Sequence, residues 1–161
     1  MGHCNIKKEI IRNVYRIVTE IERRMGMSNM PAKEVLERVY GESVKSGERF
    51  AHVAKCFAEN FKDAEVEFFT SPGRTEMVGN HTDHNGGKII AASISLDTIG
   101  AAAPNGTGTI RILSEGYDKI EVEIAKASSV EKKSGTKALI AGMVEAIGKF
   151  GYKVEGFDAY M

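Results

Sequence analysis

The sequence lacks several features that would assign it quickly to a class of protein. Its 161 residues carry 22 basic and 22 acidic side chains, so no excess charge indicates a surface for nucleic acid or a membrane. No apolar run approaches the roughly 20 residues of a membrane-spanning helix. The first residues include Lys7, Lys8 and Glu9 and no apolar core, which argues against a secretory signal.

Cysteine and histidine are also scarce. The two cysteines, Cys4 and Cys56, lie far apart, which predicts free thiols in a cytoplasmic protein. His52 and Cys56 have the i, i+4 spacing of a helical metal site. Because no further ligand accompanies them, we interpret both as core or surface residues and predict no metal site.

The residues that are present form a helical first part and a strand-rich second part. Hydrophobic residues make up 42% of the chain, enough for one domain with a core. Strands segregated from helices favour an α+β fold. The apolar periodicity predicts helices near 6–25, 31–40, 46–61 and 134–150, and strands near 65–70, 88–103, 109–113, 119–124 and 152–161.

Several details of these elements can be predicted. Residues 104–108 read as a hairpin turn, and 88–103 as a buried strand or strand pair. Ser134 is a candidate cap for the last helix. The strand at the end of the chain has no evident partner. The last helix is expected to turn Ala138, Leu139, Met143, Val144, Ile147 and Phe150 inward.

The most informative stretch runs from Ser71 to Gly87, between two strand-like segments. A hairpin connection needs only about two to five residues, so this length favours a binding loop on a rigid scaffold. Its glycines permit close approach of backbone to a ligand. Its polar side chains are Arg74, Glu76, Asn80, His81, Asp83, His84 and Asn85.

This stretch resembles the sugar-binding signature of the galactokinases, which are GHMP small-molecule kinases. Three positions depart from the family pattern: Glu76 replaces Asn, Asn80 replaces Glu, and His84 replaces Tyr. The family's Glu at the position of Asn80 binds a sugar hydroxyl, and an amide there still donates and accepts but brings no charge. The matching residues are Gly73, Arg74, Met77, Val78, Gly79, His81, Asp83, Asn85 and Gly87.

The resemblance implies a fold and an activity. The fold is the ribosomal-protein-S5-domain-2-like N-terminal domain of GHMP kinases, a mixed sheet backed by helices, here truncated. Residues 1–161 would form this one sugar-binding domain, beginning with a helical segment at 1–62 and lacking the C-terminal domain. The activity is transfer of the ATP γ-phosphate to the anomeric hydroxyl of galactose.

The resemblance also assigns roles to individual residues. Asn80, His81 and Asp83 would contact sugar hydroxyls, and His84 would make a further contact with the sugar. Arg74 would lie beside the reacting hydroxyl, where a permanent positive charge stabilises the transferring group. Glu76 is interpreted as pairing with a nearby base.

Two parts of the kinase machinery have no counterpart in the chain. The family's Gly-Leu-Ser-Ser-Ser-Ala phosphate loop and its downstream aspartate base are missing. We therefore expect ATP and Mg²⁺ only in a full-length protein and none on this chain. As an N-terminal fragment, it is expected to be inactive alone and to self-associate through apolar surface left by the missing C-terminal domain.

Three other functions stay open on the sequence. One is a non-catalytic galactose sensor, and another is a kinase for a related sugar. A third is a metal-dependent hydrolase, because residues 81–84 read His-Thr-Asp-His. That function would need further histidines, and only His3 and His52 remain.

Overall fold

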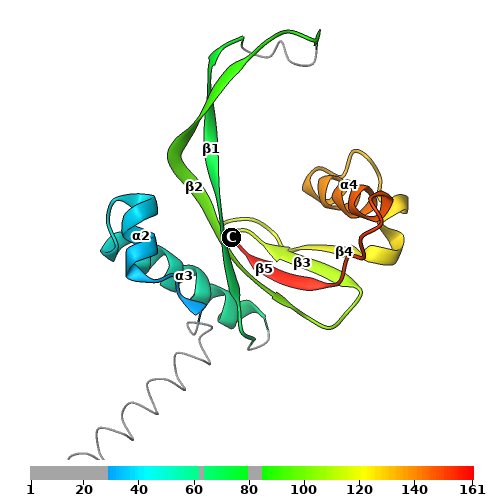
Figure 1. Cartoon of the computed structure of the whole chain (residues 1–161). Coiled ribbons are helices and arrows are strands. Elements are labelled where there is room, and N and C mark those ends of the chain that lie inside the picture. The colour runs from blue at the N-terminus through cyan, green and yellow to red at the C-terminus, as the bar shows by residue number, and fades with distance from the viewer. Residues whose placement is uncertain (1–28, 62–63, 80–84) are drawn as a thin grey trace, which may run out of the picture.

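The computed structural model describes residues 29–61, 64–79 and 85–161 (Figure 1). A five-stranded sheet in the order β1-β2-β5-β3-β4 forms its centre. The mixed sheet with its helices confirms the predicted α+β architecture. Its elements are α2 (Lys33–Tyr40), α3 (Val44–Asn60), β1 (Glu67–Val78), β2 (Ile90–Pro104), β3 (Thr109–Leu113), β4 (Ile120–Glu123), the 3-10 helix η3 (Ile124–Ser129), α4 (Thr136–Lys149) and β5 (Phe157–Tyr160).

Helices α2 and α3 pack against one face of the sheet, as their apolar spacing predicts. Helix α2 ends at Gly41, whose φ of 76° is the left-handed conformation of a helix C-cap. Of the apolar residues of α2, only Leu36 is buried, and Val35 and Val39 are exposed. Because α2 has only eight residues, it contacts this core through the turn that contains Leu36. The core here comprises Leu36, Phe50, Val53, Phe57, Val66, Ile99, Ala101, Ala103 and Tyr160.

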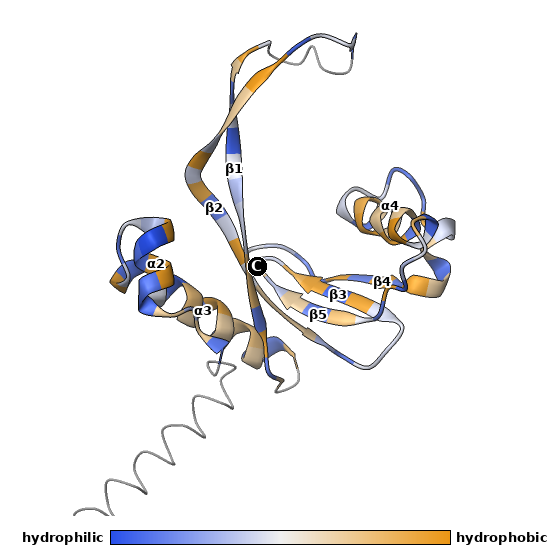
Figure 2. Cartoon of the chain, viewed as in Figure 1, coloured by the Kyte–Doolittle hydropathy of each residue, from blue (hydrophilic) through white to orange (hydrophobic). Residues whose placement is uncertain are grey.

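The opposite face of the sheet carries α4, which covers β3 and β4. Its contacts come from Ala141 and Val144, which pack with Ile110 and Val122. The predicted inward set is therefore largely wrong: among its large members, Leu139, Met143, Ile147 and Phe150 are exposed. Figure 2 shows the resulting hydrophobic colouring around α4.

The start of α4 also differs from the sequence prediction. Gly135, not Ser134, precedes the first helical residue, and no side chain caps it. The other helix prediction, near 6–25, lies outside the described residues. Within 29–61, 64–79 and 85–161, no helix combines the length and the apolar character needed to cross a membrane.

Strand β5 lies in the middle of the sheet, so the prediction that the last strand lacks a partner is wrong. It pairs antiparallel with β2, with Ala101 opposite Tyr160. It also pairs parallel with β3, with Leu113 opposite Tyr160. Residues 104–108 do form a short connection, but β2 and β3 are separated by β5 and are not paired as a hairpin.

This connection passes closely over the residue that precedes β5. Gly156 donates its backbone N–H to the carbonyl of Thr107 at 3.0 Å and accepts from the Asn105 N–H at 3.2 Å. A Cβ at position 156 would collide with the Thr107 carbonyl oxygen and lie 2.7 Å from the Asn105 Oδ1. The close approach therefore requires glycine there.

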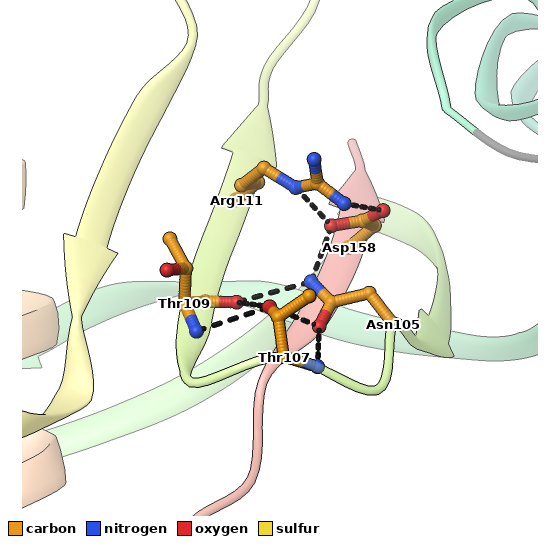
Figure 3. Close-up of polar contacts among 5 residues, drawn as sticks. All are labelled: Asn105, Thr107, Thr109, Arg111 and Asp158. Carbon is orange, nitrogen blue, oxygen red and sulfur yellow. Dashed lines mark hydrogen bonds and ion pairs between the residues drawn. The ribbon is translucent and has the colours of Figure 1, made fainter.

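A buried carboxylate holds β5 between its neighbours (Figure 3). Asp158 accepts two hydrogen bonds from the Arg111 guanidinium, from Nε and from Nη2, each at 2.7 Å. Asn105 donates a third at 2.7 Å from Nδ2. The Asp158 side chain is only 4% exposed, and the paired carboxylate raises the pKa of Arg111.

Replacing this carboxylate should destabilise the fold. Asp158→Asn removes the charge but keeps the shape, and it leaves the largely covered Arg111 without its counterion. We expect the free energy of unfolding in urea to fall by about 2–3 kcal/mol. Glu155→Gln, in the exposed Lys153–Glu155 pair, is the control and should leave the urea midpoint unchanged. Equal midpoints for all three chains would contradict the anchoring role.

Candidate functional site

The predicted binding loop is mostly a β-hairpin arm. Strands β1 and β2 continue beyond the rest of the sheet as a two-stranded projection (Figure 1). Residues 71–78 belong to β1, so the prediction of one long loop over 71–87 is wrong for its first half. The part of β2 in the arm, 90–96, is exposed on both faces, which corrects the prediction of a buried strand there. With neither face buried, the arm has no apolar alternation to reveal it as a strand.

The arm bends where β1 carries a bulge. The register with β2 shifts between Pro72 and Arg74. Proline donates no backbone hydrogen bond, so a bulge accommodates it within the ladder. A Cβ at Gly73 would lie 3.1 Å from the Ile94 side chain and 3.2 Å from the Leu96 carbonyl, so the two strands are close together at this point.

A second buried carboxylate anchors the base of the arm to the helices. Asp97 of β2 lies opposite Pro72 and accepts hydrogen bonds from Tyr40 at 2.7 Å and Thr70 at 2.6 Å. The Arg49 guanidinium pairs with its other oxygen at 2.6 Å. Its side chain is 6% exposed. These contacts join α2, α3 and β1 at one point.

The sequence contained a signal for this anchor, because Asp97 is the one charge in an otherwise apolar segment. Burial by itself would raise the pKa of Asp97. The hydrogen bonds from Thr70, Tyr40 and Arg49 and the positive charge of Arg49 outweigh burial, so the pKa lies below its ordinary value of 3.8.

A glycine directly after β1 lets the two sides of the arm approach each other closely. Gly79 has a φ of 93°, and a Cβ there would collide with the carbonyl oxygen of Lys88. The two ends of the segment between Gly79 and Lys88 are therefore held close together. The predicted sugar contacts Asn80, His81, Asp83 and His84 belong to this segment and lie outside the described residues.

Arg74 is the one predicted site residue whose side chain the structure describes. It lies on β1 in the arm, and its Nη2 pairs with the Glu76 Oε1 at 3.2 Å. This pair confirms the interpretation that Glu76 binds a nearby base. Arg74 is 67% exposed and thus accessible from solvent.

The helical His52–Cys56 pair meets a third polar residue in the fold. His52 Nε2 lies 3.1 Å from a Glu115 carboxylate oxygen and 3.6 Å from the Cys56 sulfur. In the part of the chain that the structure describes, these and other His, Cys, Asp and Glu residues form no group of three or more that could hold a metal ion.

The sheet face beside α4 has an open apolar hollow of about 620 Å³. It lies over β1, β2 and β5, on the side opposite α3. Glu67 and Glu155 are the charged residues in its lining. The apolar lining includes Phe69, Gly100, Ala102, Phe157, Ala159 and Met161.

Comparisons with known proteins show that this chain is similar to galactokinases. The galactokinase galactose-binding signature matches residues 55–104, which include the C-terminal end of α3 and both strands of the arm. A galactokinase from Lactococcus lactis subsp. lactis is 39% identical over 106 residues, 63% of this chain and 27% of that protein. A galactokinase from Lactiplantibacillus plantarum is 33% identical over 108 residues, 65% of this chain and 28% of that protein.

A solved structure agrees with these matches. The crystal structure of Lactococcus lactis galactokinase complexed with galactose has a TM-score of 0.61 and 31% identity, and covers 70% of this chain and 30% of that one. The resemblance to galactokinases and the fold of a GHMP kinase N-terminal domain are thereby confirmed. The chain spans about a quarter of the length of the curated relatives it matches.

The Asp97 anchor predicts a pH dependence of stability. Because its folded pKa is lowered, its contribution is present above the ordinary value of 3.8 and is lost as the pH falls through the folded pKa. The unfolding free energies of the wild-type chain and Asp97→Asn should differ by about 2 kcal/mol at pH 6. The difference should shrink as the pH falls below 3.8 and vanish once the pH is below the folded pKa of Asp97. Tyr40→Phe removes one donor and should show a smaller difference. Urea titrations at several pH values test this, and a difference constant with pH would contradict it.

Proposed function

We propose, on the premise that this chain corresponds to the N-terminal part of a galactokinase, that the tip of the β1–β2 arm binds galactose. The observation that carries this proposal is the match of residues 55–104 to the galactose-binding signature, on an arm anchored at its base by Asp97. The parent activity is then transfer of the ATP γ-phosphate to the anomeric hydroxyl.

The chemistry divides among the signature residues. An aspartate accepts hydrogen bonds from neighbouring hydroxyls, which suits Asp83 to a sugar. Asn80 and His81 each donate or accept and would complete the hydroxyl contacts, with His84 at the edge of the site. Arg74 would stabilise the charge that develops as the phosphoryl group moves.

The remaining requirements of the reaction would be supplied from outside residues 1–161. Holding ATP phosphates needs a run of backbone N–H groups at a helix N-terminus, and the family's glycine–serine loop has no counterpart here. In this proposal, ATP and Mg²⁺ bind to other parts of a longer, cytoplasmic kinase. The 161-residue chain alone transfers no phosphate.

The apolar hollow beside α4 would be the surface that packs against the rest of that kinase. Exposed apolar area of this kind marks an interaction surface. In the isolated chain, the same surface would promote association between copies.

A galactose-sensing regulator without turnover is the second candidate. The replacement of the family's Glu by Asn80 favours it, because an amide retains hydrogen bonding but loses a charge. Both candidates place galactose at the same arm. They differ in phosphate transfer by the full-length protein, which a sensor would lack.

The sugar proposal is tested by calorimetric titration of the chain. We expect binding of galactose in preference to glucose and N-acetylgalactosamine. Asp83→Ala should weaken galactose binding about tenfold or more, because a charged hydrogen-bond acceptor is lost. Arg74→Ala should weaken it less, since that residue is assigned to the transferring group.

The matched control for this titration is Asp118→Ala, an exposed aspartate in the β3–β4 turn. It should leave the affinity unchanged. Equal affinity for galactose and glucose, or no effect of Asp83→Ala, would count against the proposal.

The apolar hollow predicts self-association of the 161-residue chain. Sedimentation velocity should show larger species as the concentration rises, because association removes exposed apolar surface from water. Phe69→Lys places a charge in the hollow and should return the chain to a monomer. Tyr117→Lys changes an exposed aromatic residue of the β3–β4 turn and should not. Monomeric wild-type chain at all concentrations would refute this part of the proposal.

A further inference from the structure

We propose that Glu76 is a positioning residue for the Arg74 guanidinium and makes the arm favour neutral sugars over sugars that carry a carboxylate. This inference rests on the proposed sugar site. It concerns a position where the chain departs from the family signature, since Glu76 stands in place of an Asn.

The strand geometry brings the two side chains together. Residues two apart on a strand point to the same face, so Arg74 and Glu76 are neighbours on β1. Their partners on β2 are Ser93 and Ala91, both small. No bulky side chain across the pair therefore competes with the contact, and Nη2 of Arg74 lies 3.2 Å from Oε1 of Glu76.

The two partners differ strongly in exposure. The Glu76 side chain is 15% exposed, whereas Arg74 is 67% exposed. A carboxylate withdrawn from water is costly unless charged or polar groups compensate it. Glu76 is therefore the fixed partner, and it holds one edge of the guanidinium along the strand. The other donors of the planar guanidinium remain open to a ligand.

The pair sets the local charge that a ligand meets. With Glu76 present, the cation of Arg74 is balanced, and the carboxylate repels a second carboxylate. Without Glu76, the guanidinium becomes an unbalanced cation with a fork geometry that suits carboxylates. Galacturonate, which is galactose with a carboxylate at C6, should then gain affinity, whereas neutral galactose should be little affected.

The experiment uses the 161-residue chain, with NMR observation of the Arg74 Nε–H resonance and titrations with galactose and galacturonate. Glu76→Gln removes the charge and keeps the shape, and Glu76→Asp keeps the charge on a shorter side chain. Glu155→Gln is the matched control, because Lys153 and Glu155 form another i, i+2 pair at 2.9 Å outside the arm. Thermal unfolding of each variant checks that the fold is retained.

In Glu76→Gln, we expect the Arg74 resonance to shift and the ratio of galacturonate to galactose affinity to rise about two- to fivefold, the range of exposed charge pairs. Glu76→Asp should retain the wild-type ratio, and Glu155→Gln should change neither readout. An unchanged Arg74 resonance in Glu76→Gln would overturn the positioning role. An unchanged affinity ratio would overturn the selectivity.

The two proposals fail in different ways. If the wild-type chain binds neither sugar, the sugar site on this chain is refuted, and so is the selectivity that depends on it. The Arg74 resonance then decides the positioning role alone, because it reports the ion pair without a ligand.

Discussion

The sheet depends on the hydrogen bonds and the ion pair made by the buried carboxylate of Asp158. This carboxylate binds Arg111 on β3 and Asn105 in the connection before that strand, and it lies on β5. Since β5 lies between β2 and β3 in the sheet order, these contacts join the β1–β2 half to the β3–β4 half. Removing a charge from water is favourable only when its partners are well placed. Here the partners come from segments about 50 residues before it in the chain, so the contact specifies this topology.

A second buried carboxylate, Asp97, holds the β1–β2 arm in the same way. The arm leaves the sheet at the bulge beside Pro72, and its exposed strands have little apolar packing to hold them. Tyr40, Arg49 and Thr70 converge on Asp97 and tie the arm to both helices. The direction of the arm is therefore set at its base by charge-assisted hydrogen bonds.

The arm contains residues that match the galactokinase signature and residues that depart from it. Arg74 is retained, and the structure pairs it with Glu76, a residue that the family pattern does not have. A guanidinium held by a neighbouring carboxylate keeps its remaining donors for a ligand, but the pair has a different net charge from a free guanidinium. In the proposed sugar site, a change beside Arg74 would alter which sugars bind without altering the scaffold.

The amino-acid sequence by itself determined the kinds of elements, the α+β class and the resemblance to galactokinases, because these depend on local periodicity and on a run of specific residues at 73–87. It predicted Arg74 as a site residue, and it predicted that Glu76 pairs with a nearby base. Only the tertiary structure decided that the last strand lies in the middle of the sheet, that residues 71–78 form a strand, and that α4 leaves Leu139 and Phe150 exposed. Strand pairing and burial depend on contacts between segments that are distant in the chain. A local pattern of apolar residues does not determine which of these segments come into contact.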